Sequence, residues 1–148
     1  MKNYVYILVP FVSVILAQIV KFVIESIKNK KMNFERLLNG NGGMPSSHTS
    51  FTFSLVMCIG FKEGFDTIYF AISFVFACIV AYDAFNVRFE SGKQAVAINL
   101  LTESIFGKDK KTSIKHLKEE LGHKPLEVLM GVFLATIVSF IFVVIFKF

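Results

Sequence analysis

A glycine-rich turn leads into a proline, two serines and a histidine over residues 42–48, which read Gly-Gly-Met-Pro-Ser-Ser-His. The glycines let the backbone approach a ligand closely, and Pro45 predicts the first turn of a helix that continues to residue 59. The amides of Ser46, Ser47 and His48 are then free donors at a positive helix end, where a phosphate binds well. An ordinary N-cap formed by one of the serines is the alternative interpretation.

A second histidine also precedes a proline-led apolar helix, in the segment 121–131. Glu127 follows His123 by four residues, so both side chains can share one helix face. The carboxylate can then hold the imidazole in one tautomer and favour its charged form. This is the arrangement of a nucleophile with its orienting group. An acidic first turn that complements the helix dipole is the simpler alternative.

The composition is that of a membrane protein. Of 148 residues 54% are hydrophobic, 18 are Phe, and the mean hydropathy is +0.61. The sequence predicts an all-α, polytopic membrane helix bundle that forms a single domain over residues 1–148. Four apolar stretches predict about four transmembrane helices, at residues 4–24, 46–61, 67–85 and 126–146. The second is short, with a rise of about 24 Å as a helix, and the first is expected to be an uncleaved anchor.

The parity of four crossings places the polar residues of the motifs on one side of the membrane. Lys21 ends the first apolar stretch, His48 begins the second, Arg88 follows the third and His123 precedes the fourth. Asp83 lies within the third stretch, where a charge is costly and usually has a partner. We expect it to pair with Lys21 or Arg88; helix packing by a hydrogen-bonded Asp83 is the alternative.

The basic residues favour one orientation of this bundle. Only Lys2, Lys62 and Lys147 belong to the side opposite the motifs. Twelve others flank the motifs: Lys28, Lys30, Lys31, Arg36, Arg88, Lys93, Lys108, Lys110, Lys111, Lys115, Lys118 and Lys124. The positive-inside rule therefore predicts an integral protein of the cell membrane whose site faces the cytoplasm. Some of these charges could instead serve anionic head groups, and nothing in them suggests a partner nucleic acid.

The stretch between Arg88 and His123 is expected to hold two helices. Residues 91–106 predict an amphipathic helix in the membrane interface, and residues 113–121 a short polar helix with a solvated His116. This insertion could form a lid over the site or a plain connector. Cys58 and Cys78 lie in apolar stretches and are expected to be buried, and no His or Cys spacing predicts a metal site.

These motifs together resemble the type-2 phosphatidate phosphatase and vanadium haloperoxidase superfamily, and in particular its small divergent bacterial and plastid branch. The family pattern is Lys-x6-Arg-Pro, Pro-Ser-Gly-His and Ser-Arg-x5-His-x3-Asp. Residues 45–48 are similar to the second motif with Ser47 in place of glycine, and His123-x3-Glu127 to the end of the third. Residues 89–122 separate Arg88 from His123 where the family has five residues. The first motif is missing, and Lys21 and Arg36 are its stand-ins.

The resemblance implies a membrane lipid phosphate phosphatase that works without a cofactor or metal through a phosphohistidine. His123, oriented by Glu127, would be the nucleophile and His48 the general acid and base. Arg88, Lys21 and Arg36 would bind the phosphate with Ser46, Ser47 and Gly43, supported by Asp83. At the cytoplasmic face of the lipid bilayer the expected substrate is phosphatidylglycerol phosphate or phosphatidic acid. Alternatives are an undecaprenyl pyrophosphate phosphatase, a non-catalytic scaffold that retains an anion pocket, and an ion channel or transporter. The small size of the chain suggests that it forms a homodimer.

Overall fold

The fold is built from helices packed side by side, as predicted. The computed structural model describes residues 3–29, 43–106, 116–119 and 121–146, and every regular element in these ranges is helical. The elements are α1 (Val5–Asn29), α3 (Ser47–Glu63), α4 (Ile68–Tyr82), the π-helical turn η1 (Asp83–Val87), α5 (Arg88–Phe106) and α6 (Pro125–Phe146).

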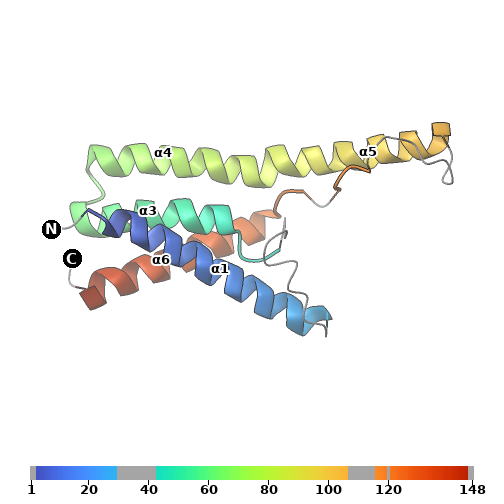
Figure 1. Cartoon of the computed structure of the whole chain (residues 1–148). Coiled ribbons are helices and arrows are strands. Elements are labelled where there is room, and N and C mark those ends of the chain that lie inside the picture. The colour runs from blue at the N-terminus through green and yellow to red at the C-terminus, as the bar shows by residue number, and fades with distance from the viewer. Residues whose placement is uncertain (1–2, 30–42, 107–115, 120, 147–148) are drawn as a thin grey trace.

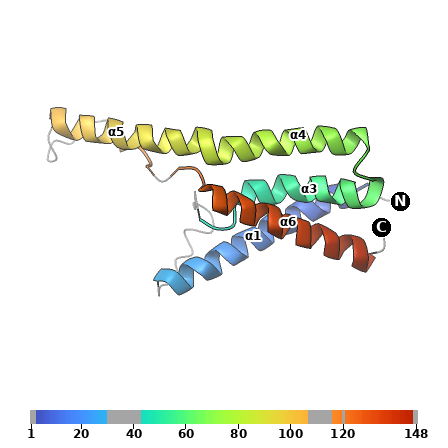
Figure 2. The ribbon, with the colours of Figure 1, turned by 180° about the vertical axis from the view of Figure 1, so that it is seen from behind.

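Helix α3 lies at the centre of the bundle. It packs against α1, α4 and α6, while α1 also contacts α6. Figures 1 and 2 show these four helices running alongside one another, with the α3–α4 turn and both chain ends at one end of the bundle. Nine of the 17 residues of α3 are buried, so the other helices enclose much of the short apolar stretch predicted at residues 46–61.

Three helical stretches are long and apolar enough to cross a membrane: Val5–Lys28, Ile68–Ile105 and Pro125–Phe146. Their outward side chains are large and apolar, including Phe11, Phe133 and Ile145. Helix α3 has a rise of about 26 Å and runs antiparallel to α1 within this bundle (Figure 1). The structure therefore confirms a polytopic membrane helix bundle, in which α3 is the interior member.

Small polar side chains tie α3 to its neighbours. The Ser13 hydroxyl of α1 contacts the Ser50 hydroxyl at 2.9 Å, and the Ser139 hydroxyl of α6 donates to the Ser54 carbonyl at 2.9 Å. All four serines are fully buried. In an apolar solvent, small residues and hydrogen bonds between helices replace much of the hydrophobic driving force, so these contacts set how closely α1 and α6 approach α3.

The boundary predicted after the third apolar stretch is wrong. Helices α4 and α5 are joined through η1 into one continuous rod, Ile68–Ile105, of 38 residues. Figure 1 shows α5 continuing in line with α4 well past the other helices. Within α5, Ala95 is buried by protein, whereas Ile98 and Leu101 are exposed on its surface.

A returning segment, residues 116–119 and 121–124, runs from α5 back toward α6. The buried Asn99 side chain amide donates to the Leu117 carbonyl at 2.9 Å and to the Glu119 carboxylate at 2.8 Å, and its oxygen accepts from the Leu117 N–H. These contacts hold residues 116–119 in a non-helical conformation. The polar helix predicted at 113–121 is therefore wrong over residues 116–119, and residues 113–115 and 120 lie outside the described residues. His116 is exposed, as expected.

At Gly131, helix α6 lies close to the start of α3. A Cβ atom there would lie 2.8 Å from the Ser46 carbonyl oxygen and 3.0 Å from the Thr49 Cβ. We expect Gly131→Val to force the two helices apart and destabilise the protein by roughly 1–3 kcal/mol, the usual cost of overpacking. The buried Cys58 thiol is a reporter of unfolding. Its reaction with a thiol dye, in a variant lacking Cys78, should begin at a lower temperature.

Leu129→Phe is the matched control for this prediction. It adds volume to the same helix at a side chain that is 63% exposed. If Cys58 begins to react at the same temperature in both variants and in the parent protein, the contact at Gly131 does not limit the packing of α6 on α3.

Candidate active site

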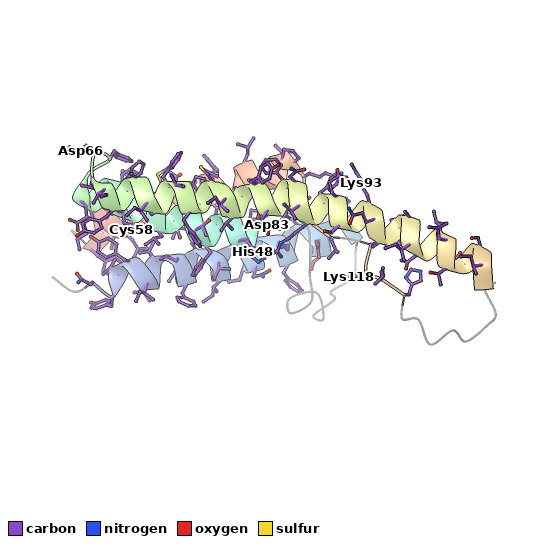
Figure 3. All side chains as sticks on the ribbon, turned by 90° about the horizontal axis from the view of Figure 1, so that it is seen from above. His48, Cys58, Asp66, Asp83, Lys93 and Lys118 are labelled. Carbon is purple, nitrogen blue, oxygen red and sulfur yellow. The ribbon has the colours of Figure 1, made fainter. Side chains whose placement is uncertain are left out.

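Four helix ends point to the same end of the bundle, as the parity argument predicted, although α1 diverges from the other helices toward its own end (Figures 1 and 2). Helix α1 ends, α3 begins, α4 ends and α6 begins there (Figure 1). Figure 3 shows His48 and Asp83 beside each other at this end, and Cys58 and Asp66 toward the opposite end. His48 lies within electrostatic range of Arg88, His123, Lys21 and Asp83.

His123 and Glu127 form the hydrogen-bonded pair that their spacing predicted. The His123 Nδ1 atom lies 2.9 Å from a Glu127 carboxylate oxygen, and the His123 side chain is only 6% exposed. The same carboxylate oxygen accepts from the Lys124 N–H at 3.2 Å. A carboxylate on Nδ1 selects the tautomer in which Nδ1 carries the proton, which leaves the lone pair on Nε2 free. An imidazole in this form can act as a nucleophile.

The π-helical turn η1 anchors the backbone of His123. The Arg88 N–H donates to the Asp83 carbonyl five residues earlier, where an α-helix would use Ala84. The Ala84 carbonyl accepts a hydrogen bond from the His123 N–H at 2.9 Å. Such turns often mark functional sites. No feature of the sequence predicted this one.

Two glycines let the returning segment pass directly over α5. A Cβ atom on Gly92 would lie 2.6 Å from the Glu119 carbonyl oxygen, and one on Gly122 would lie 2.5 Å from the Phe89 nitrogen. Gly122 also has a positive φ of 81°, which a residue with a Cβ adopts only with strain. The glycines therefore allow a long insertion to deliver His123 next to the start of α5.

The N-terminal end of α3 differs from the prediction in two ways. Helix α3 begins at Ser47, so Pro45 precedes the helix and Ser46 is its N-cap, accepting from the Thr49 N–H. The Ser46 N–H donates to the Glu127 carbonyl at 2.9 Å. The Ser46 amide is therefore not the free phosphate donor that was expected. Its hydrogen bond to Glu127 joins the start of α3 to α6 instead.

The Ser47 hydroxyl, at the start of α3, is an unsatisfied polar group. This hydroxyl is buried and has no hydrogen-bond partner among the described residues, and the residue is 6% exposed. Leaving a buried hydroxyl unpaired costs free energy. A ligand oxygen at the start of α3 would satisfy it together with the helix N-terminus.

The cations of the site come from α1 and α5. Lys21 is only 4% exposed and interacts electrostatically with Glu25 and Glu127. The Arg88 Nε atom lies 2.6 Å from an Asp83 carboxylate oxygen, so Asp83 pairs with one of its two predicted partners. About half of the Arg88 side chain is exposed, which leaves its remaining donors accessible.

The other predicted phosphate-binding residues are Gly43 and Arg36. A Cβ atom on Gly43, whose φ is 84°, would lie 3.0 Å from a Glu25 carboxylate oxygen and 3.4 Å from the Lys21 Cδ. Gly43 therefore passes close to Lys21. Arg36 lies outside the described residues. Of the two cysteines, Cys58 is buried as expected and Cys78 is exposed.

Burial lowers the pKa of His123 below its ordinary value, since the charged imidazole would lose its hydration. The hydrogen bond to Glu127 opposes this shift, whereas the positive charges of Lys21 and Arg88 reinforce it. The net direction keeps His123 neutral at pH 7. That is the protonation state in which Nε2 can attack.

The comparisons with known proteins agree with the motifs. The model of the Divergent PAP2 family matches residues 1–138. The chain is 35% identical, over 144 residues, to the uncharacterized membrane protein YuiD of Bacillus subtilis (strain 168), a match that covers 88% of this chain and 90% of that protein. The chain belongs to the Divergent PAP2 family. No solved structure matches it significantly.

In this member of the Divergent PAP2 family, two motif residues that are far apart in sequence lie close together in space. Residues 89–122 lie between Arg88 and His123, yet both side chains interact electrostatically with His48. The Ala84 carbonyl and the close contact at Gly122 hold the end of the insertion near its beginning. The insertion therefore leaves and returns to the same place.

The pKa of His123 can be measured directly. In a variant with His48→Gln and His116→Gln, NMR of isotope-labelled histidine in micelles reports His123 alone, since the chain has three histidines. We expect titration below the usual pKa of about 6.5. Glu127→Gln should lower the pKa further, because the carboxylate stabilises the imidazolium. A pKa at or above the usual value would mean that burial does not dominate.

Proposed function

We propose that the protein is a membrane lipid phosphate phosphatase that works through a phosphohistidine on His123. The observation that carries this proposal is the buried His123–Glu127 hydrogen bond of 2.9 Å, in a site that also holds Lys21 and Arg88. Membership of the Divergent PAP2 family supports a phosphatase-related role. A neutral, oriented imidazole next to cations is suited to attack on phosphorus.

In the first step, His123 Nε2 attacks the phosphorus atom and the bond to the leaving oxygen breaks. Glu127 accepts the hydrogen bond from Nδ1 and stabilises the positive charge that develops on the ring. Lys21 and Arg88 bind the non-bridging oxygens, and the unpaired Ser47 hydroxyl donates to one of them. His48, protonated on its ring, gives its proton to the leaving alkoxide. The products are the alcohol and phosphorylated His123.

In the second step, His48 is the base. It removes a proton from a water molecule, whose oxygen attacks the phosphorus, and the bond between phosphorus and Nε2 breaks. Inorganic phosphate leaves, while His123 is again neutral and His48 again protonated. His48 is exposed, which gives this step access to water.

The substrate we propose is a lipid phosphate in the cytoplasmic leaflet, either phosphatidylglycerol phosphate or phosphatidic acid. The reason for this side is the excess of basic residues in the sequence segments that flank the motifs. An undecaprenyl pyrophosphate on the outer leaflet would require the opposite orientation.

The histidines should fail in different ways when replaced. His123→Ala should abolish both phosphate release and labelling of the protein by ³²P-labelled lipid phosphate, because no phosphoenzyme can form. His48→Ala should lower turnover by roughly 10²–10⁴-fold, the usual contribution of general acid–base catalysis, with some labelled protein remaining. His116→Ala, at an exposed histidine of the returning segment, is the matched control and should change neither.

The assay is run in EDTA, with vanadate as a mimic of five-coordinate phosphorus and expected inhibitor. Activity that disappears in EDTA and returns with magnesium would contradict the phosphohistidine scheme. If no lipid phosphate releases phosphate while the protein still binds inorganic phosphate, the pocket is an anion site of a non-catalytic scaffold.

The orientation of the site can be tested with single cysteines in a variant lacking Cys58 and Cys78. Lys118 and Asp66 lie at opposite ends of the molecule (Figure 3). Lys118→Cys should resist a membrane-impermeant thiol reagent in intact cells and react after lysis, whereas Asp66→Cys should react in intact cells. The reverse pattern would place the site outside and favour an outward-facing carrier-lipid phosphatase.

A further inference from the structure

A groove leads from the candidate active site into the membrane-facing part of the bundle. Its volume is about 350 Å³, and it lies between α1 and α4 with α3 as its floor. Most of its wall is apolar, formed by Val14 of α1, Phe51 of α3, and Phe76 and Val80 of α4. Phe76 is 57% exposed, so the groove opens toward the surrounding lipid.

The polar end of this groove is the active site itself. Ser47 and His48 line it together with Gln18, and Ser47 has the buried hydroxyl without a partner. A molecule in the groove that ends in phosphate would thus place its oxygens next to that hydroxyl and next to His48.

The two helices that flank the groove continue directly into charged residues of the site. On α1, Val14, Gln18 and Lys21 follow one another at the spacing of one helix face, and Val80 of α4 is followed three residues later by Asp83 at the start of η1. The distance from Val14 to Lys21 along the helix axis is about 10 Å. The apolar surface and the ionic groups therefore form one continuous track.

We propose that this groove holds the hydrocarbon chain, acyl or prenyl, of the lipid phosphate whose head is bound at His48 and His123. The inference rests on the proposed function and adds the part of the substrate that the site recognises beyond phosphate. A chain moving from lipid into the groove exchanges one apolar surrounding for another. The groove thus orients the ester for attack, while a phosphate ester without a chain reaches the exposed His48 from water.

Val80→Phe, which fills the groove, tests this directly. It should lower kcat/KM for dioleoyl phosphatidic acid in mixed micelles at least 10-fold and leave hydrolysis of p-nitrophenyl phosphate within 2-fold of the parent protein. The matched control is Val75→Phe, which adds the same side chain to α4 where the residue is 59% exposed and outside the groove lining. The control should retain both activities.

A second measurement detects the chain without turnover. The chain contains no Trp, so Phe76→Trp and, as a control on α6, Phe133→Trp each supply one fluorophore. In the His123→Ala background, a few mole per cent of phosphatidic acid with brominated acyl chains in unbrominated vesicles should quench Trp at position 76 saturably. Quenching at position 133 should be weaker and rise linearly.

The outcomes separate this inference from the proposed function. Hydrolysis of phosphatidic acid with equal losses in the Val80→Phe and Val75→Phe variants, or equal quenching at positions 76 and 133, overturns the groove proposal and leaves the phosphatase intact. Selective quenching at position 76 in a protein whose unsubstituted form hydrolyses no phosphate ester supports the groove and overturns the phosphatase.

Discussion

The hydrogen bond from the Ser46 N–H to the Glu127 carbonyl couples the helix that carries His48 to the helix that carries Glu127, the partner of His123. It joins the N-cap of α3 to the first turn of α6. It forms because Gly131, one helical turn after Glu127, allows the two backbones to touch. Without it, a buried N–H would be left unsatisfied, at a cost of roughly 1–3 kcal/mol. The positions of His48 and of the His123–Glu127 pair are therefore not independent.

Pairing the charged side chains reduces the free-energy cost of desolvating them at the edge of an apolar bundle. Asp83 contacts Arg88, and Glu127 contacts both the His123 ring and the Lys124 N–H. Ser47 is buried and its hydroxyl has no hydrogen-bond partner among the described residues, whereas the buried Lys21 interacts electrostatically with Glu25 and Glu127.

Much of the bundle follows from hydropathy, and the gathering of the polar residues follows from parity alone. The apolar stretches and the positions of Lys21, His48, Arg88 and His123 at their ends were sufficient to predict one shared end. The spacing of four residues predicted the His123–Glu127 contact, although His123 itself precedes α6, which begins at Pro125. Pro125 starts α6 as its type suggests.

Other features depend on contacts between distant residues, which local patterns do not record. The π-helical turn Asp83–Val87 is accompanied by the hydrogen bond from His123 to Ala84. The predicted boundary before residue 91 is wrong because the apolar stretch ends at residue 85, whereas the helical stretch continues through charged residues as far as Ile105. The prediction of a free Ser46 amide is wrong because the partner of this amide, the Glu127 carbonyl, is 81 residues away in sequence.

The pairing of α5 with the returning segment has a consequence for length variation among relatives. A helix advances about 1.5 Å per residue and an extended chain about 3.3 Å. Contacts at Asn99 and Gly92 hold α5 and the returning segment side by side. Removing one helical turn from α5 is thus matched by removing about two residues from the returning segment. Sequences can lengthen or shorten here in that unequal ratio while the end of the bundle that holds His48 and His123 stays in register.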